Sequence, residues 1–290
     1  MNLNEIHKQW IRRGLALLCR HIQVRGRRRA VRLLARHLLP ANRLETLPLA
    51  GSLLPLDLSD SDSALMYYGL YEEQEVRLVR RFVRSGDTVL DIGANIGFYT
   101  ILLAGIVGES GEVHAFEPLP ANFLRLRTAV SSNHLNNVRL NRMALGSTNG
   151  IMQFYANISH SKETSAVASR FAIWGSEANA VETMNLDTYV TQNNLTRLDF
   201  IKIDIEGGEW EAFQGMEDTL SRLKPRAILA EVWSPQAHLH YRSDHEKDTT
   251  FPAVDDICRY VKRFGYDVKL VNCGPSSDGV ENMLFVRTPN

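Results

Sequence analysis

The sequence predicts an α/β fold, in which a mostly parallel sheet carries helices on both faces and follows a basic helical N-terminal extension. Three observations support this prediction. Strand and helix patterns alternate from about residue 70 onward, which is typical of a parallel sheet covered on both sides. Polar and glycine residues gather where two of the expected strands end. Basic residues are concentrated in the first 50 positions.

The composition is typical of a folded soluble protein. The chain has 290 residues, of which 44% are hydrophobic and 23% are charged, and these values exclude wholesale disorder and a multi-span membrane protein. The three cysteines, Cys19, Cys258 and Cys273, lie far apart and form no C-x-x-C pair. They support neither a disulfide framework nor a zinc ribbon, so a reducing, cytoplasmic location is expected.

The N-terminal segment differs from the rest of the chain in charge. Residues 1–50 hold 11 Lys and Arg against two Glu, a net charge of 11 − 2 = +9, so the remaining residues must sum to −9. The apolar run at 14–19 is too short for a signal peptide, and no stretch is long enough to span a membrane. Apolar spacing predicts helices within residues 1–40, and the Pro-, Ser- and Asp-rich residues 40–62 are expected to form a linker.

The predicted division of the chain is therefore an extension with its linker at 1–62 and a catalytic domain at 63–290. Two roles for the extension stay open. A basic amphipathic helix can lie on an anionic membrane surface, which would make the protein membrane-peripheral. Alternatively, the helices pack against the acidic domain or against a second subunit of a homo-oligomer. Nucleic-acid binding is not expected, because the arginines accompany leucines and no known binding motif.

The elements of the catalytic domain follow from hydrophobic periodicity. The expected helices span residues 72–83, 98–107, 121–130, 210–220 and 254–264. The expected strands span residues 88–92, 113–116, 138–140, 198–205, 227–232, 268–271 and 283–286. Residues 142–197 interrupt the alternation; 151–155 are interpreted as an extra strand and the remainder as an irregular excursion.

The first chemical motif is a glycine turn after the first expected strand. A dinucleotide fingerprint starting at Gly93 would require glycine at 95 and glycine or alanine at 98, but the chain has Asn95 and Phe98. Glu117 ends the next strand, 117 − 93 = 24 positions on, where a carboxylate can accept hydrogen bonds from both hydroxyls of a ribose. This combination suits a nucleoside ligand without phosphates, such as S-adenosylmethionine (SAM), whose positive groups also favour Asp91. The alternative is a glycine turn that serves packing alone.

The second motif lies in residues 200–209, where isoleucines alternate with Lys202, Asp204 and Glu206. A polar row on a central parallel strand is costly unless it lines a site. Ligands of open α/β sheets bind at the carboxyl ends of the strands, and Glu231 closes the next strand. The alternative is an edge strand with a solvated face.

Together these residues resemble the FkbM family of SAM-dependent methyltransferases. The matching segments are Asp-Ile-Gly-Ala-Asn-Ile-Gly-Phe-Tyr-Thr (91–100), Ala-Phe-Glu-Pro-Leu-Pro (115–120), Leu-Asp (186–187) and Ile-Lys-Ile-Asp-Ile-Glu-Gly (201–207). The resemblance runs from about residue 71 to the C-terminus. It implies the Rossmann-like, seven-stranded class I methyltransferase fold, which ends in an antiparallel hairpin. It also implies SAM as cofactor and O-methylation, commonly of sugar or polyketide hydroxyls.

The resemblance also implies a set of site residues. The SAM-site positions are Asp91, Gly93, Asn95, Gly97, Glu117, Met143 and Ala144, the last two near the adenine. Asp204 and Glu206 match the family's acidic D-x-E-G element. We expect one of them to accept the proton of the acceptor hydroxyl, with Glu231 next in line. Residues 156–182 follow no pattern of the family.

The resulting prediction is a SAM-dependent O-methyltransferase that acts on a small-molecule or glycan hydroxyl. An NAD(P)-dependent oxidoreductase is the main alternative, and Asn95 and Phe98 argue against it. A catalytically inert SAM-fold binding module is a second alternative, opposed by intact Glu117, Asp204 and Glu206. No metal is expected, because the histidines at 238, 240 and 245 lack a matching carboxylate spacing.

Overall fold

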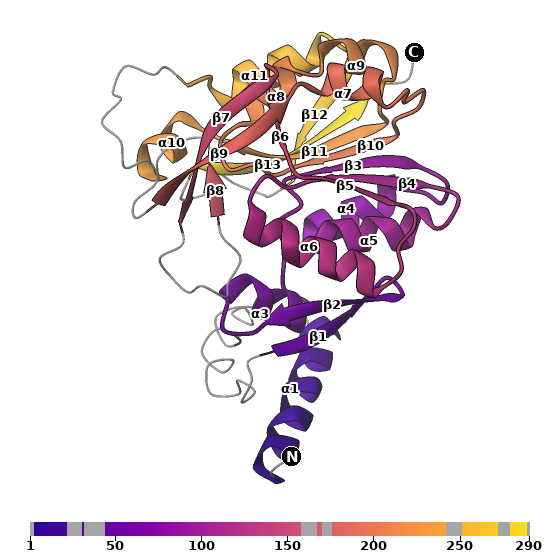
Figure 1. The fold of residues 1–290 in the computed structure, drawn as a ribbon, viewed down its shortest axis with the longest axis vertical. Helices are drawn as coiled ribbons and strands as arrows, with labels where there is room; N and C mark the ends of the chain where they lie inside the picture. The colour runs from indigo at the N-terminus through magenta and orange to yellow at the C-terminus, as the bar shows by residue number, and fades with distance from the viewer. Residues whose placement is uncertain are drawn as a thin grey trace.

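The predicted α/β fold is confirmed by a computed structural model, which describes residues 3–21, 31, 44–157, 167–169, 176–241, 251–271 and 279–288. A seven-stranded sheet in the order β12-β13-β11-β10-β3-β4-β5 forms its centre (Figure 1). The strands are β3 (Thr88–Ile92), β4 (Glu112–Phe116), β5 (Val138–Asn141), β10 (Phe200–Ile203), β11 (Ala227–Trp233), β12 (Tyr266–Leu270) and β13 (Val280–Arg287). Neighbours pair in parallel except β13, which runs antiparallel to both β11 and β12.

Helices cover both faces of this sheet (Figure 1). One face carries α4 (Glu73–Phe82), α5 (Phe98–Val107) and α6 (Pro120–Ser132); the other carries α7 (Leu186–Gln192), α8 (Glu209–Gln214), α9 (Glu217–Arg222) and α11 (Val254–Lys262). The strands alternate accordingly: Val89 and Phe200 belong to the core under α5, whereas Leu90 and Ile201 belong to the opposite core. The helix expected over 210–220 is in fact two helices, which meet at Gly215.

The interpretation of residues 40–62 as a linker is wrong for the part that the structure describes. An antiparallel hairpin, β1 (Leu44–Leu49) and β2 (Ser52–Asp57), precedes helix α3 (Ser61–Tyr68). Leu54 and Leu56 are fully buried in the core that also holds α5, while Leu53 between the turn and Leu54 is exposed. The hairpin is therefore part of the packed structure, and the division of the chain at residue 62 stays a prediction.

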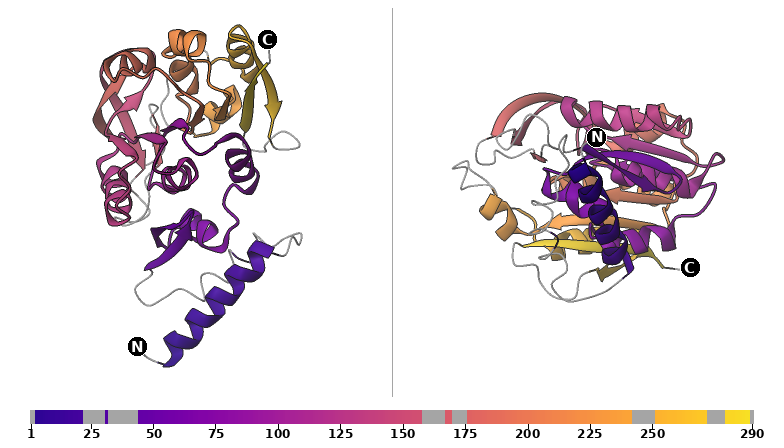
Figure 2. Two further views of the ribbon diagram at one scale, coloured as in Figure 1. Left: turned by 90° about the vertical axis from the view of Figure 1, so that its right-hand side faces the viewer. Right: turned by 90° about the horizontal axis from the view of Figure 1, so that it is seen from below.

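The first helix, α1 (Leu3–His21), projects from the hairpin side of the molecule (Figures 1 and 2). Its inner side buries Ala16 and Cys19, and the Arg12 guanidinium donates to Glu45 at 3.0 Å. Its other side exposes large apolar side chains, among them Trp10, which is 69% exposed. In the described part of the chain, no helix combines the length and apolar character needed to cross a membrane. The helices expected between residues 22 and 40 lie outside the described residues except for position 31.

A second sheet replaces most of the excursion expected over 142–197. Its strands, in spatial order, are β6 (Ala144–Leu145), β9 (Ser176–Met184), β7 (Gly150–Asn157) and β8 (Val167–Ser169). The extra strand expected at 151–155 is thus confirmed and lies within β7. The prediction that the rest of residues 142–197 is irregular is wrong for β9 and for α7. Helix α7 begins after its N-cap Asn185, whose side chain accepts a hydrogen bond from the Thr188 N–H at 2.7 Å.

The order of the strands determines where a ligand can bind. From β3 the chain proceeds through β4 and β5 toward one edge of the sheet, and from β10 through β11 toward the other. Such a reversal between neighbouring strands leaves a crevice at their carboxyl ends. Both chemical motifs follow the strands at this point, β3 and β10. Because β10 lies between β3 and β11, the edge-strand alternative for residues 200–206 is wrong.

Candidate functional site

A cavity of about 270 Å³ occupies the crevice at the carboxyl ends of β3, β4 and β10. Most of the residues predicted for a ligand site line it: Gly93, Asn95, Glu117, Met143, Ala144, Asp204 and Glu206. The wall also contains apolar and aromatic side chains, including Phe116 at the end of β4 and Phe154 from β7. Three of the predicted residues, Asp91, Gly97 and Glu231, do not line the cavity. The structure thus brings the two motifs to one hollow, with the second sheet as an additional wall.

The glycine turn after β3 is required by backbone geometry. Gly93 has a φ of 86°, and a Cβ atom at this position would lie 1.8 Å from the carbonyl oxygen of Asp204. Gly97 has a φ of 100° and is the N-cap of α5, where its carbonyl accepts from the Ile101 N–H at 2.9 Å. Only glycine adopts such conformations without strain. The turn therefore allows the loops after β3 and β10 to touch while still facing the cavity.

Glu117 is the carboxylate that the sequence assigns to a ribose. Its side chain is 4% exposed and accepts hydrogen bonds from the Asn95 and Leu119 N–H groups, both at 2.9 Å. Burial raises the pKa of Glu117 to about 7, although these N–H groups act in the opposite direction. The Asn122 side chain also donates a hydrogen bond to Glu117. Since a carboxylate has about four lone-pair sites, it retains capacity for a further donor from the cavity. The neighbouring Asn95 Oδ1 is buried and accepts no hydrogen bond from any described residue.

Asp91 supports the turn from beneath and is only 1% exposed. Its carboxylate accepts from the Thr100 hydroxyl on α5 at 2.5 Å. Burial raises the pKa of Asp91 to about 6, and the Thr100 hydrogen bond opposes this shift. Asp91 thus links β3 to the first turn of α5 rather than facing the cavity directly.

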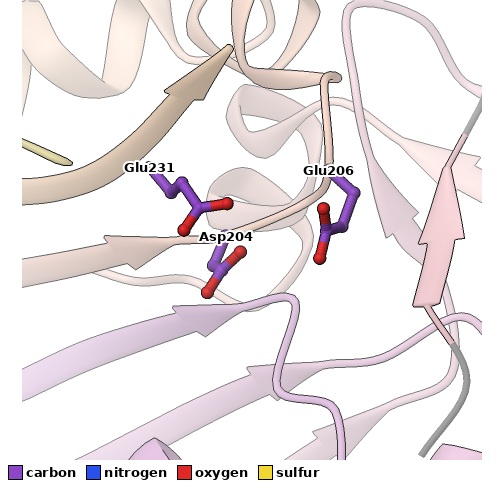
Figure 3. A group of neighbouring side chains, drawn as sticks. All are labelled: Asp204, Glu206 and Glu231. Atoms are coloured by element: carbon purple, nitrogen blue, oxygen red, sulfur yellow. The ribbon is translucent and has the colours of Figure 1, made fainter. Parts of the chain in front are cut away.

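Three carboxylates meet at the opposite end of the cavity; we call Asp204, Glu206 and Glu231 the carboxylate triad (Figure 3). One oxygen of each lies within 4.8 Å of the other two. Asp204 and Glu206 follow β10 and line the cavity, whereas Glu231 reaches the triad from β11. Burial and then Asp204 raise the pKa of Glu206 and that of Glu231 well above their ordinary value. Two of the three carboxyls are thereby held in the proton-bearing form to higher pH.

The sequence motifs did not assign three further polar residues at this end. Lys202 on β10 is 1% exposed, and its ammonium lies 3.3 Å from Asp204 Oδ2 and 5.1 Å from the centre of the Tyr99 ring. The Tyr99 hydroxyl donates to Glu72 at 2.6 Å. Lys202 and Tyr99 belong to the two sequence motifs, at 200–209 and 91–100, but the motifs gave neither of them a role. Glu72 precedes α4 with a left-handed φ of 39°, and no sequence pattern pointed to it.

The composition of the triad also bears on metal binding. Three carboxylates at this spacing can hold a cation, but Lys202 already places a positive charge beside Asp204. His238 is buried and stacks on Phe251, with their ring centres 3.9 Å apart. It does not belong to the group of described side chains whose ligand atoms lie close enough together to hold a metal ion. The side chains at 240 and 245 lie outside the described residues. The expected absence of a metal stays a prediction.

The arrangement can hold a nucleoside at one end of the cavity and remove a proton at the other. A family model described as "Methyltransferase FkbM domain" matches residues 91–268, which is more than half of the chain. The match includes the glycine turn, Glu117 and the carboxylate triad. The family predicted from the sequence motifs is therefore confirmed.

Two curated proteins and one solved structure are among those similar to this chain. Hexuronic acid methyltransferase AglP from Haloferax volcanii is 28% identical over 161 residues, which cover 56% of this chain and 62% of AglP. The 31-O-demethyl-FK506 methyltransferase FkbM from Streptomyces tacrolimicus is 26% identical over 215 residues, covering 65% of this chain and 82% of that protein. A crystal structure of methyltransferase FkbM from Methylobacillus flagellatus KT has a TM-score of 0.45 at 16% identity, covering 89% of this chain and 58% of that one.

Proposed function

The chain belongs to the FkbM methyltransferase family, and from this membership we propose that it is a SAM-dependent O-methyltransferase. The acceptor is a hydroxyl of a sugar, a glycan or a related natural product; the two relatives are named for a hexuronic acid and for 31-O-demethyl-FK506. One observation carries the proposal. A single cavity joins a buried carboxylate suited to a ribose, Glu117, to two carboxylates that can take a proton, Asp204 and Glu206.

The residues present fit SAM as the cofactor. Glu117 would accept hydrogen bonds from the two ribose hydroxyls, and Met143 and Ala144 would lie near the adenine among apolar neighbours. The unpartnered Asn95 Oδ1 offers an acceptor for a donor group of the ligand. Gly93 lets the backbone approach the ligand, while Asp91 and Gly97 hold the turn in place from outside the cavity.

The protein does not need to activate the methyl group, because SAM supplies it in activated form when it is bound. Methyl transfer is an in-line displacement, so the cavity must align the acceptor hydroxyl with that methyl group. Asp204 or Glu206 would accept the hydroxyl proton as the new bond forms. Glu231 does not line the cavity, so it would influence the proton transfer only through its interactions with Asp204 and Glu206.

The proposal can be tested with the purified full chain in two steps. Calorimetry should show that SAM and its demethylated product bind and that NAD does not. Mass spectrometry should then find a product enlarged by one CH₂ when SAM is combined with candidate glycans and other hydroxyl compounds. Binding without any product across a broad acceptor panel would favour the inert-module alternative; NAD binding in place of SAM would favour the oxidoreductase.

We further propose that α1 contacts an anionic membrane surface, which would make the protein membrane-peripheral. One side of the helix exposes Trp10, Ile11, Leu17 and Leu18, while its other side packs on the hairpin and α3. Apolar side chains beside basic ones are the features of an interfacial helix. The two roles predicted for the extension, packing and membrane contact, can thus belong to opposite sides of one helix.

The membrane proposal requires a test that leaves the packed side of α1 intact. The variant Trp10→Ser/Leu17→Ser/Leu18→Ser keeps Ala16, Cys19 and the Arg12–Glu45 pair. The full chain should sediment with anionic vesicles at low salt, and the variant should sediment less. Equal pelleting of both proteins would contradict the proposal, and a change of oligomeric state in the variant would assign the exposed side to a second copy of the chain.

A further inference from the structure

Lys202 lies in the middle of the sheet, where a charge is costly to bury. Its strand, β10, pairs with β3 and β11, and Lys202 is in register with Asp91 and Leu229. Leu229 belongs to the core beneath α5, so Lys202 points to the same face of the sheet. Only 1% of the side chain is exposed. Such a lysine persists in a central strand only where nearby groups compensate its charge.

The compensation comes from one carboxylate above all. The Lys202 ammonium lies 3.3 Å from Asp204 Oδ2, its only ion pair among the described residues. Its other contacts are the Ile203 carbonyl at 3.5 Å and the face of the Tyr99 ring at 5.1 Å. Burial lowers the pKa of Lys202, but Asp204, Glu72 and Glu231 more than offset burial and raise it above the ordinary value. The ammonium therefore stays charged throughout the neutral range.

The carboxylates around Lys202 outnumber it. Counting only side chains in the described part of the chain, Glu72 and the triad would together carry four negative charges against the positive charge of Lys202. Burial, reinforced by Asp204, raises the pKa of each of the other three, Glu72, Glu206 and Glu231. Among the four, Asp204 alone forms the direct ion pair with the ammonium. Asp204 is consequently the carboxylate that the Lys202 ammonium contacts directly.

We propose that Lys202 is a positioning residue that selects Asp204 as the base of the methyl transfer. The ammonium pairs with the Asp204 carboxylate at 3.3 Å and orients it at the cavity, while burial favours the protonated forms of Glu206 and Glu231. In the transfer the acceptor oxygen gains the methyl group as the sulfonium–carbon bond breaks and its electron pair returns to sulfur. The hydroxyl proton passes to Asp204. This inference rests on the proposed function and names which carboxylate performs its proton transfer.

Other titratable groups also face Lys202 and its partners. Asp91 approaches from β3, Tyr99 from α5 and Glu72 from the start of α4, while Asp62 of α3 acts on Glu206. Burial raises the pKa of Tyr99 well above its ordinary value, so the phenol stays neutral. A pH profile below neutrality therefore reports on carboxyl groups, and the variants must show which one.

The first experiment compares the pH dependence of kcat/KM in the full-length wild type, Lys202→Met and Lys202→Arg. Loss of the cation should move the acid limb of the Lys202→Met profile to higher pH by about 1–3 units. Lys202→Arg keeps the charge and should keep the limb near its wild-type position, even if kcat falls. A uniform loss of activity in both variants, with an unmoved limb, would reduce Lys202 to a structural role and overturn the proposal.

A second measurement does not depend on turnover. Carboxyl carbon resonances of ¹³C-labelled aspartate can be followed against pH, with Asp204→Asn identifying the Asp204 signal. The wild-type signal should remain that of an ionised carboxylate to lower pH than in Lys202→Met. If wild-type Asp204 instead binds its proton near neutral pH, the proposal is wrong. Should the protein bind no SAM while Asp204 behaves as expected, the proposed function fails and the electrostatic role of Lys202 stands.

The double variant Lys202→Met/Asp204→Asn covers the case in which Lys202→Met alone does not fold. It removes both charges of the pair, so no unpaired ammonium or carboxylate is left buried. If Lys202 acts through Asp204, the double variant should be no slower than Asp204→Asn alone. A further fall of tenfold or more in kcat, with the fold intact by circular dichroism, would show that Lys202 acts on another group.

Discussion

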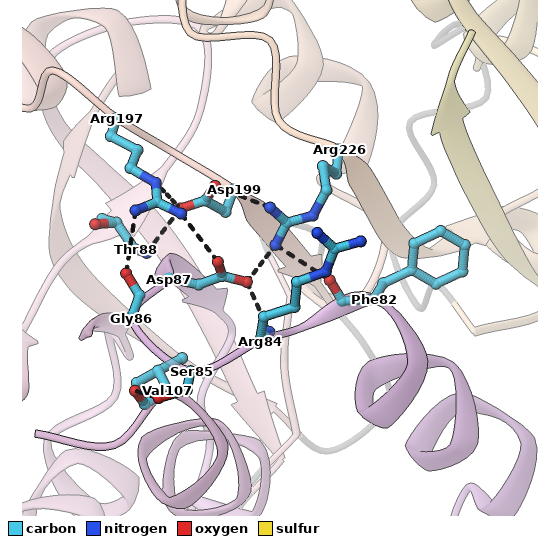
Figure 4. Close-up of polar contacts among 10 residues, drawn as sticks. All are labelled: Phe82, Arg84, Ser85, Gly86, Asp87, Thr88, Val107, Arg197, Asp199 and Arg226. Atoms are coloured by element: carbon cyan, nitrogen blue, oxygen red, sulfur yellow. Dashed lines mark hydrogen bonds and ion pairs between the residues drawn. The ribbon is translucent and has the colours of Figure 1, made fainter. Parts of the chain in front are cut away.

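The two ends of the same three strands carry charge in opposite ways. Before β3, β10 and β11, Asp87 and Asp199 alternate with Arg197 and Arg226 in one network (Figure 4). Asp87 is 1% exposed, accepts from the Arg84 N–H at 2.7 Å and pairs with both arginines. Two carboxylates meet two guanidinium groups there, so the charges of the four side chains balance.

At the carboxyl ends of these strands, carboxyl groups outnumber cations among the residues that the structure describes. The triad and Glu72 face one ammonium, that of Lys202, and burial raises the pKa of three of the four carboxyls. Uncompensated desolvation and like-charge repulsion destabilise a fold. Carboxyl groups whose pKa is shifted in this way are typical of functional sites. The salt-bridge network before the strands therefore stabilises the sheet, and we assign the proposed methyl transfer to the carboxyl ends of the strands.

The first prediction concerns the carboxyl ends of the strands. Asp204→Asn removes the carboxylate paired with Lys202 while preserving its shape, and turnover should fall about 10²–10⁴-fold, the usual effect of losing a general base. SAM affinity and the melting temperature should change little in comparison. Asp218→Asn is a matched control, because Asp218 forms an exposed pair with Arg222 on α9 and does not line the cavity. Wild-type turnover in Asp204→Asn would move the base to Glu206.

The second prediction breaks the salt-bridge network before the strands. Asp87→Ala removes one of the two carboxylates that pair with both Arg197 and Arg226, and it leaves the Arg84 N–H without its acceptor. The free energy of unfolding should therefore fall by about 1–3 kcal/mol. The SAM dissociation constant should stay near the wild-type value where the variant is folded. Denaturant unfolding checks the first statement and calorimetry the second. The exposed Asp256–Arg259 pair supplies the control: Arg259→Ala breaks the pair but keeps the hydrogen bond from the Ala253 N–H to Asp256, and it should cost about 1 kcal/mol or less.

The third prediction concerns the cofactor end of the cavity. Glu117→Gln replaces one acceptor oxygen by a donor and removes the charge, so one ribose hydrogen bond should be lost. The expected loss of SAM binding is about 1.5–3 kcal/mol, measured by calorimetry near pH 8. Turnover at saturating SAM should fall less than in Asp204→Asn. Unchanged SAM affinity would contradict the assignment of Glu117 to the ribose.

The contrast between the regions also shows what sequence reasoning can reach. Residues 88–92 and 98–107 were predicted with the bounds of β3 and α5, because both are continuous apolar segments bordered by glycine. The hairpin at 44–57 was missed because Pro48 and Pro55 were weighted as linker residues. In a two-stranded ribbon proline is tolerated, since one side of each strand needs no backbone donor. Leu54 and Leu56 are buried, but the exposed Leu53 and Pro55 beside them are also apolar, so the sequence shows no clear alternation of apolar and polar residues in this strand.

The site was predicted where chemistry and chain order coincide, and missed where it depends on packing. Glycine, glutamate and aspartate at strand ends indicated Gly93, Glu117 and Asp204, all of which line the cavity. Glu72 could not be inferred, because its place near Lys202 depends on how α4 packs against the sheet. Lys202 was visible in the polar row, but its burial and its pairing with Asp204 follow from the central position of β10.

The last prediction uses pH to separate the two effects of burying Glu117. Burial raises the pKa of this carboxyl to about 7, while an unfolded chain leaves it near its ordinary 4.5. The ribose hydroxyls need the ionised form, so SAM affinity should fall as pH decreases below 7, by up to about tenfold, or 1.4 kcal/mol, per unit. The free energy of unfolding changes with pH in the opposite direction. Since the folded protein binds the extra proton, the contribution of Glu117 is fully present below about 4.5 and is lost as pH rises through 7.

Glu117→Gln cannot titrate at this position and should flatten both dependences, the affinity curve by calorimetry and the stability curve by denaturant unfolding. The stability curve should flatten only in part, because burial also raises the pKa of Glu209 to about 7 and that of Asp91 to about 6. A wild-type SAM affinity that is constant from pH 6 to pH 8 would contradict the prediction. It would mean that Glu117 is already ionised across this range, and that the backbone N–H groups of Asn95 and Leu119 compensate its burial in full.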